Sequence, residues 1–286
     1  MSEPARTSPR SARATADPAT RAAVDDLLGR LEGIGDPEVA AWWERYLRGA
    51  IRFRGIRMAG VRKGVEAWAG EPAHADPSLR RAAGLEAFGS PWAEDKIAGI
   101  LVLQLEADGI DLDALDAIAD LFRVGLVADW NTTDWLCVKV LDRVVRRDPA
   151  LADRVAGWAL DRSEATWLRR AGLVGFVGVA PAWAAGSDSG LERVIAAADA
   201  LASSTERFHQ TAVGWVVREI SRGDAVRATE FLRARLERLT AEAVTQATGA
   251  LEPSLRGAIR AEARATRQRR SADRAPSSRP GPSGRR

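Results

Sequence analysis

The chain has 286 residues, of which 46% are hydrophobic and 28% are charged, and its formal net charge is +3. This length and apolar content suffice for one sizeable buried core, and no apolar run approaches the roughly 18 residues that span a bilayer. A single cysteine, Cys137, excludes an internal disulfide, and two histidines are too few for a Cys/His zinc cluster. We therefore expect a cytoplasmic protein, monomeric, with no membrane contact, no metal and no cofactor.

The basic charge is concentrated at the C-terminus. Nine arginines against Glu262 and Asp273 give residues 260–286 a net charge of +7, which leaves −4 for residues 1–259. Repeated Arg, Ser and Pro with few apolar residues predict a disordered basic tail over residues 261–286. Such a tail either contacts nucleic acid nonspecifically or only keeps the chain in solution.

The N-terminal residues 1–20 are rich in Arg, Ser, Ala and Pro and lack the apolar segment of a secretory signal, so they predict a disordered arm. Residues 21–260 form the one predicted domain. Within it, apolar residues recur at i, i+3, i+4 and i+7, and no sustained alternation indicates strands. The segments with this helical pattern are 24–31, 97–105, 112–121, 138–145, 171–179, 213–220 and 231–239.

A weak internal repeat underlies these helical segments. Ala98, Val138, Ala171 and Ala212 each lie early in an apolar segment, at intervals of 40, 33 and 41 residues. Intervals of this size are typical of HEAT-like helix pairs. In such an architecture the inner helices line a concave surface that can hold an elongated partner such as a duplex. We therefore predict an all-α fold, a HEAT-like helical-repeat superhelix (α-solenoid) with a concave groove.

Asp134 is the candidate for a catalytic carboxylate. It follows Trp130 by four residues, so a helix that begins early enough places the indole and the carboxylate on one face, in a compact anionic pocket. The alternative is that Asp134 is the N-cap of a helix beginning at Trp135, because Asp is a favoured capping residue. The local pattern leaves both open. The helical spacing from Asp134 to Val138 favours an inward-pointing carboxylate.

Arg170 and two aromatic residues are the other candidates. Arg170 projects from an apolar helix face together with Trp167, and a buried guanidinium needs either an internal carboxylate or a phosphate as partner. Phe208 and Trp215 lie on the side of their helix opposite its valine stripe. They are either a second core contact, as in an inner solenoid helix, or the aromatic wall of a groove that contacts a base or a sugar.

Together these motifs resemble a known family. They are Trp130-x-x-x-Asp134, Trp167-x-x-Arg170, the segment 208–215, and the upstream segment 46–63. Over about residues 40 to 260, their content, order and spacing are similar to the AlkD-like DNA alkylation-repair proteins. These are HEAT-repeat DNA glycosylases that remove positively charged N3- and N7-alkylated purines.

The resemblance implies a division of roles. Asp134 would be the catalytic residue that stabilises the oxocarbenium-like sugar and orients the attacking water, with Trp130 and Trp215 holding the sugar. Substrate-binding residues are implied at Trp130, Trp215, Arg170 and Phe208, and contacts to DNA phosphates at Tyr46, Arg62 and Lys63. The implied partner is double-stranded DNA with alkylated bases, and the implied location is the nucleoid of a bacterial cell.

Two other functions stay open. A noncatalytic paralogue that binds DNA structures would keep the groove, and a protein-binding HEAT scaffold would need neither the carboxylate nor the aromatic residues. The sequence also departs from the family pattern, with Asn131-Thr-Thr after Trp130 and with Arg207 and His209 on either side of Phe208. Such departures are expected to change the lesion preference.

Overall fold

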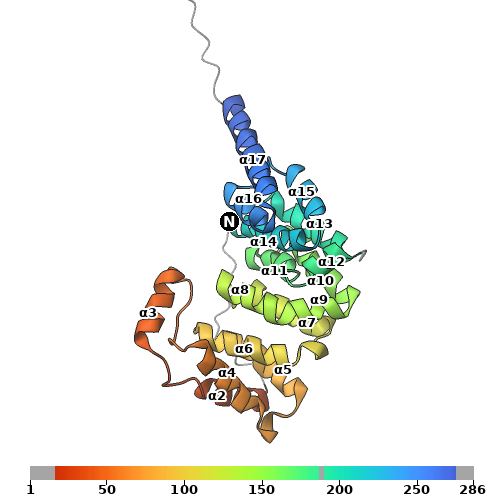
Figure 1. Ribbon diagram of the computed structural model, residues 1–286. Helices are drawn as coiled ribbons and strands as arrows, with labels where there is room; N and C mark the ends of the chain where they lie inside the picture. Colours follow the sequence, from red (N-terminus) through yellow and green to blue (C-terminus); the bar gives the residue numbers. More distant parts are fainter. Residues whose placement is uncertain (1–16, 187–189, 275–286) are drawn as a thin grey trace, which may run out of the picture.

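The computed structural model describes residues 17–186 and 190–274, and it is all-α, as predicted (Figure 1). Within these ranges no strand forms, and Arg52 and Trp92 make an isolated β-bridge. The α-helices are α2 (Pro18–Gly29), α3 (Pro37–Tyr46), α4 (Met58–Ala69), α5 (Pro77–Glu86), α6 (Ala93–Leu105), α7 (Leu112–Arg123), α8 (Trp130–Leu136), α9 (Asp142–Arg147), α10 (Pro149–Leu160), α11 (Thr166–Val174), α12 (Ala180–Ala185), α13 (Gly190–Ala202), α14 (Arg207–Gly223), α15 (Ala225–Arg233), α16 (Ala241–Ala247) and α17 (Pro253–Arg274). Short 3-10 turns lie at Pro72–His74 (η1), Ala87–Gly89 (η2), Ala107–Gly109 (η3) and Thr248–Ala250 (η5), and a π-helical turn at Cys137–Leu141 (η4).

The helices form a repeat of two rows. In one row α6, α8, α11, α14 and α16 each contact the next, and in the other α5, α7, α10 and α13 do the same. The helices therefore stack in chain order along the molecule (Figure 1). Of the predicted interval positions, 98, 171 and 212 lie in the first row and 138 lies in η4 directly after α8, so the sequence repeat follows the inner helices of the stack.

Glycines allow neighbouring helices to approach closely. A Cβ on Gly172 of α11 would lie 2.5 Å from the Ala159 nitrogen of α10, and one on Gly214 of α14 would lie 2.8 Å from the Ala243 oxygen of α16. Both positions are too tight for any side chain. The largest buried cluster includes residues from Phe88 to Ala263, so the repeats from α6 onward share one core, and a second cluster packs α2 and α4 against α5 and α6.

Two helices end earlier than the apolar pattern predicted. The pattern over 171–179 is helical only to Val174, where Gly175 caps α11, and that over 231–239 only to Arg233. Both segments stay buried after the helix ends, because Phe176, Val179 and Leu236 enter the core from turns. Because these turns are buried, the apolar pattern of the sequence continues past the end of each helix.

The predicted boundaries of both arms need correction. Helix α17 continues to Arg274, so residues 261–274 of the predicted disordered tail 261–286 are helical. Arg and Ala are both good helix formers, and Ile259, Ala263 and Thr266 are buried at helical spacing. At the other end, α2 begins at Pro18, inside the arm predicted over 1–20. Residues 1–16 and 275–286 lie outside the described residues. None of the helices described is both long enough and apolar enough to cross a membrane.

Candidate functional site

Helix α8 begins at Trp130, which decides between the two predicted positions of Asp134. The N-cap is Asp129, whose carboxylate accepts a hydrogen bond from the Thr132 nitrogen at 2.9 Å. Asp134 therefore lies inside the helix, four residues after Trp130 and on the same face. Its side chain is 16% exposed, so it points inward as the spacing predicted, although Val138, which follows in the π-helical turn η4, is 42% exposed.

Arg170 pairs with Asp134 through two hydrogen bonds. Its Nε donates to Oδ1 and its Nη2 to Oδ2, both at 2.8 Å. Its Nη1 donates to the Phe208 carbonyl at 2.6 Å and to the Thr211 hydroxyl at 3.1 Å, so the guanidinium joins α8, α11 and α14. The Arg170 side chain is 5% exposed and that of Asp134 is 16% exposed. Of the two alternatives open in the sequence, the structure shows the internal carboxylate.

Burial and the ion pair act in opposite directions on Asp134. Burial holds the pKa of the Asp134 carboxyl above its ordinary value, and the hydrogen bonds and charge of Arg170 reduce this rise. Since the charged form is costly away from water, Arg170 is the group that favours the carboxylate over the neutral acid.

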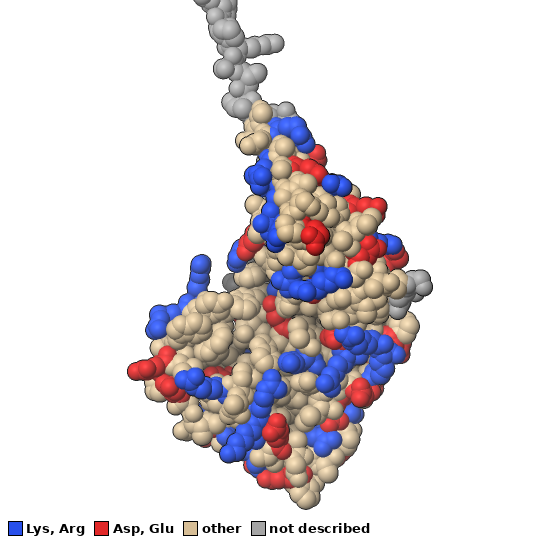
Figure 2. All heavy atoms as spheres, viewed as in Figure 1, with Lys and Arg blue, Asp and Glu red and all other residues tan. Residues whose placement is uncertain are grey.

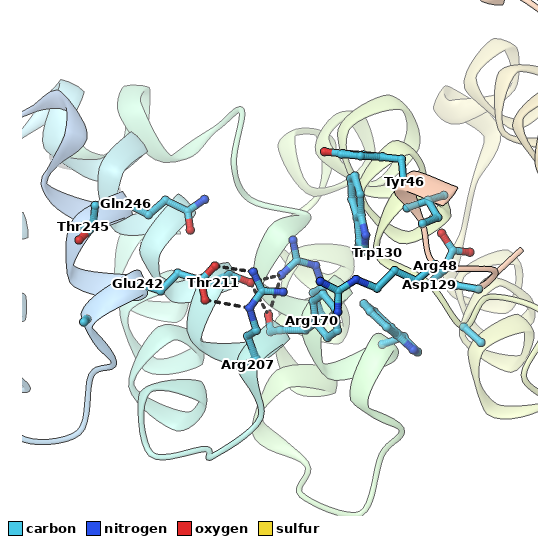
Figure 3. Close-up of a pocket in the computed structure, with 16 residues that line it drawn as sticks. Tyr46, Arg48, Asp129, Trp130, Arg170, Arg207, Thr211, Glu242, Thr245 and Gln246 are labelled. Atoms are coloured by element: carbon cyan, nitrogen blue, oxygen red, sulfur yellow. Dashed lines mark hydrogen bonds and ion pairs between the residues drawn. The ribbon is translucent and has the colours of Figure 1, made fainter. Parts of the chain in front are cut away.

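An open cavity of about 820 Å³ lies over this pair and is lined by residues of α3, α8, α11, α14 and α16 (Figure 3). Tyr46 and Trp130 meet edge to face with ring centroids 5.9 Å apart, and Trp167 and Phe208 are tilted together at 4.6 Å. Arg170 lines the cavity, and Asp134 lies against Arg170 without being part of the lining. The complete lining is Tyr46, Leu47, Arg48, Ala50, Ala128, Asp129, Trp130, Trp167, Arg170, Arg207, Phe208, Thr211, Ala241, Glu242, Thr245 and Gln246.

The segment after α3 is fastened to the start of α6. The buried Glu94 carboxylate accepts hydrogen bonds from the backbone nitrogens of Arg54, Gly55 and Ile56 at 2.8 to 3.0 Å. Arg54 also forms a two-point ion pair with the fully buried Asp95. These contacts hold the segment that follows α3 against α6, and α3 itself extends from the body of the molecule (Figure 1).

Arg48 is a lining residue that the sequence analysis did not single out. It follows the end of α3 in a left-handed conformation, with φ 54°. Its nitrogen donates to the Arg45 carbonyl and that of Gly49 to the Glu44 carbonyl, which is the Schellman pattern at a helix C-terminus. Glycine usually occupies this position. The guanidinium makes no ion pair with any described residue and extends into the cavity (Figure 3).

The other predicted site residues are only partly brought together. Phe208 and Tyr46 line the cavity, whereas Trp215 is half-buried against the main core, as the solenoid alternative predicted, and is not part of the lining. Arg62 and Lys63 are exposed on α4 and also lie outside the lining. Whether these three residues contact DNA stays a prediction.

The departures from the family pattern have local partners. Arg207 forms a two-point ion pair with Glu242 across the α14–α16 edge of the cavity, which Figure 3 shows. His209 is buried, and its two ring nitrogens lie 2.8 Å from the Ser204 hydroxyl and 3.0 Å from the Thr166 carbonyl oxygen. Burial lowers the pKa of His209 below its ordinary value. His209 therefore belongs to the packing between helices and leaves the cavity free.

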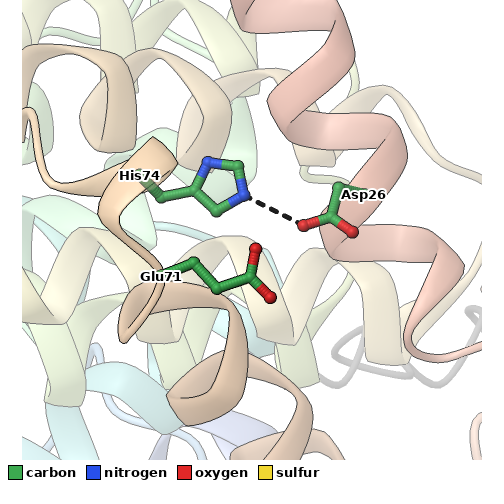
Figure 4. A group of neighbouring side chains, drawn as sticks. All are labelled: Asp26, Glu71 and His74. Carbon is green, nitrogen blue, oxygen red and sulfur yellow. Dashed lines mark hydrogen bonds and ion pairs between the residues drawn. The ribbon is translucent and has the colours of Figure 1, made fainter.

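A second group of ionisable side chains, which is not part of the cavity lining, lies at the N-terminal end (Figure 4). Ligand atoms of Asp26, Glu71 and His74 all lie within 4.8 Å of one another. The Asp26 carboxylate contacts His74 at 2.9 Å and Arg30 at 3.0 Å, and Arg30 also pairs with Glu71. Because Arg30 already balances both carboxylates, the group joins α2 to η1 as an ion-pair network, and a cation would have to displace the guanidinium.

Comparison with known proteins assigns the family. The family model described as "DNA alkylation repair enzyme" matches residues 27–251. The chain belongs to this family. Among solved structures, a predicted DNA alkylation repair enzyme from Enterococcus faecalis is similar in fold, with a TM-score of 0.66 and 18% sequence identity over 77% of this chain and 97% of that chain. No curated protein matches the sequence. The family match covers every residue that lines the cavity and ends before α17.

Proposed function

We propose that this member of the DNA alkylation repair family is a DNA glycosylase that hydrolyses the N-glycosidic bond of cationic N3- and N7-alkylated purines in duplex DNA. The observation that carries the proposal is the Asp134–Arg170 pair at a cavity with aromatic residues on two sides. A cavity of about 820 Å³ is large enough for a nucleotide.

The reaction needs few groups from the protein. The bond between the sugar C1′ and the purine nitrogen breaks, its electron pair leaves with the base, and the positively charged alkylpurine becomes neutral. Positive charge then develops on the sugar, where one correctly placed carboxylate lowers the energy of the transition state. Water adds to C1′ and releases a proton. Since the leaving base is already cationic, no general acid is required.

The chain's residues divide this work. Asp134 would face the developing charge, with Arg170 keeping the carboxylate ionised and fixed in direction. Trp130 and Tyr46 on one side, and Phe208 on the other, would pack against the sugar and its neighbours. Arg170 has its nitrogens occupied by Asp134, Phe208 and Thr211. The unpaired Arg48 is therefore the better placed cation for a backbone phosphate at this cavity.

The test is release of bases from methylated duplex DNA by the purified protein, followed by mass spectrometry. Asp134→Asn should lower single-turnover release of 7-methylguanine and 3-methyladenine by about 100-fold, with DNA affinity little changed, because the loss concerns charge present only in the transition state. Asp142→Asn is the matched control, since Asp142 is also partly buried and paired, with Arg146 on α9. It should release bases at the wild-type rate per folded molecule.

One observation favours the noncatalytic alternative, namely that Asp134 lies against Arg170 and outside the cavity lining. A protein that only binds DNA would retain tight duplex binding and release no base at any enzyme concentration. That result would overturn the glycosylase proposal, whereas equal release by wild type and Asp134→Asn would overturn the catalytic role of Asp134 alone.

A further inference from the structure

Helix α17 carries an arginine row that the family match does not include. The row consists of Arg256, Arg260, Arg264 and Arg267. At about 100° per residue these four positions lie within an arc of about 80° on one face of the helix. They flank the buried stripe of Ile259, Ala263 and Thr266 on one side, and Arg269 flanks it on the other. The family model ends at residue 251, before α17 begins.

The arginine row begins beside the cavity. Arg260 donates from Nε to the Thr248 hydroxyl and from Nη2 to the Thr245 carbonyl, both at 2.8 Å. Thr245 itself lines the cavity. The row therefore continues the α16 side of the cavity along α17, and Figure 2 shows basic side chains along the left edge of this upper part of the molecule.

The arginine row lacks carboxylate partners. The guanidinium groups of Arg256 and Arg264 make no ion pair or hydrogen bond with any side chain or backbone that the structure describes, and Nη1 of Arg267 is buried without a partner. Exposed arginines on the neighbouring helices are paired instead. These pairs are Arg207–Glu242, Arg227–Glu192, Arg233–Glu262 and Arg238–Asp199.

Unpaired arginines on one face repel one another unless an anion balances them, so their concentration on α17 indicates an anionic partner. From Arg256 to Arg267 the row extends about 16 Å along the helix axis. One strand of B-DNA has a phosphate about every 3.4 Å along its axis, so this length matches about five nucleotides. A backbone that leaves the cavity on the α16 side would meet the row directly.

We propose that the arginine row is a second DNA-binding surface, which holds the phosphate backbone of duplex DNA adjacent to the cavity. The inference rests on the proposed function only in taking duplex DNA as the partner. The row would add affinity without sequence preference, because it contacts phosphates and not base edges.

The test compares two double variants of the full chain that lose the same charge from α17 and its neighbour. Arg256→Ala with Arg264→Ala removes half of the row, and Arg233→Ala with Arg269→Ala removes two arginines beside the opposite flank of the helix. Binding to an undamaged fluorescent duplex is measured by anisotropy over a range of salt concentrations. The row variant should lower the slope of log affinity against log salt by about 1.8, at about 0.9 per lost phosphate contact. The control should change the slope by less than half of that.

Two further results separate the alternatives. Equal slopes for both double variants, with helix content unchanged by circular dichroism, would overturn the proposal, because only total charge would then matter. Loss of binding to phosphatidylserine vesicles without loss of duplex binding would overturn it in favour of a membrane surface.

Base release by the wild-type chain is measured separately. If the arginine-row variant lowers the salt slope but the wild-type chain releases no base, only the glycosylase proposal is contradicted. If the wild-type chain releases bases but the row variant does not lower the slope, only the proposal of a second DNA-binding surface is contradicted.

Discussion

At the scale of single residues, the pairing of Asp134 with Arg170 is the feature that the sequence left undecided. The sequence left open whether Asp134 shares a helix face with Trp130 or caps a helix at Trp135, and the start of α8 decides for the shared face. The partner of Arg170 could not be predicted, because an internal carboxylate and a phosphate satisfy a guanidinium equally well. Arg48 was missed for a different reason, since an arginine after a helix gives no signal of a left-handed backbone.

The pair predicts strong energetic coupling. Arg170→Met should destabilise the fold by about 3 kcal/mol, because it leaves the poorly exposed Asp134 carboxylate without its partner. Asp134→Asn combined with Arg170→Met should cost at least about 1 kcal/mol less than the sum of the single changes, since no charge is then left unpaired. Urea unfolding of the four proteins measures this cycle. Additive costs would show that the pair contributes nothing beyond its separate packing.

The same pair predicts a change in pH dependence. Removing Arg170 removes the group that lowers the pKa of Asp134, so the carboxyl should hold its proton to a higher pH. If base release requires the carboxylate, the acid limb of kcat/KM should move to higher pH in Arg170→Met than in the wild type. Overlapping acid limbs would contradict the assignment of Asp134 as the ionised group.

At the scale of elements, helix identity was predictable and helix ends were not. The apolar periodicity located α6, α11 and α14 of the inner row, but buried turns after α11 and α15 extended the same pattern past the last helical residue. The capping role of Asp129 was also missed, because Asp134 competes with it as a cap in the sequence. The attachment of α3 depends on Glu94, which is 38 to 40 residues away from its backbone partners and so leaves no local pattern.

The turn at Gly55 is the weak point of that attachment. Its φ is +85°, and an added Cβ would lie 1.9 Å from the Asp36 carbonyl oxygen. Gly55→Ala should therefore cost about 3 kcal/mol, from backbone strain together with the clash. Gly49→Ala is the matched control, since its φ is +73° with nothing within 4 Å of the added atom, and it should cost only about 1 kcal/mol. Both are measured by urea unfolding, and equal costs would show that the close approach is unimportant.

At the scale of the whole molecule, apolar periodicity predicted the all-α fold, and the intervals of 33 to 41 residues predicted the inner row of helices. Composition misled at the C-terminus, where an Arg-rich segment forms the end of α17. The alanines of this segment have a high helix propensity, and Ala263 belongs to the small buried stripe that joins α17 to the core.

The charge of residues 275–286 predicts that they contribute to duplex binding and not to base release. Residues 275–286 contain three arginines and no acidic residue, and they follow α17 in the sequence. Deleting them should weaken duplex binding at low salt and leave single-turnover base release at saturating enzyme within about twofold. Anisotropy at two salt concentrations and a base-release assay measure this. A large loss of release at saturation would show that the chemistry depends on the C-terminal residues.

The left-handed backbone of Arg48 implies that stability and DNA binding are opposed at the rim of the cavity. Left-handed conformations cost most residues about 1 kcal/mol, and asparagine adopts them more readily than arginine. Arg48→Asn should therefore raise the free energy of unfolding by up to about 1 kcal/mol. It should also lower the slope of log affinity against log salt for duplex binding by about 0.9, the value for one phosphate contact. A variant that is more stable but binds duplex DNA with lower affinity would show that selection has kept a strained arginine for its charge. A variant with unchanged binding would leave that strain without a benefit.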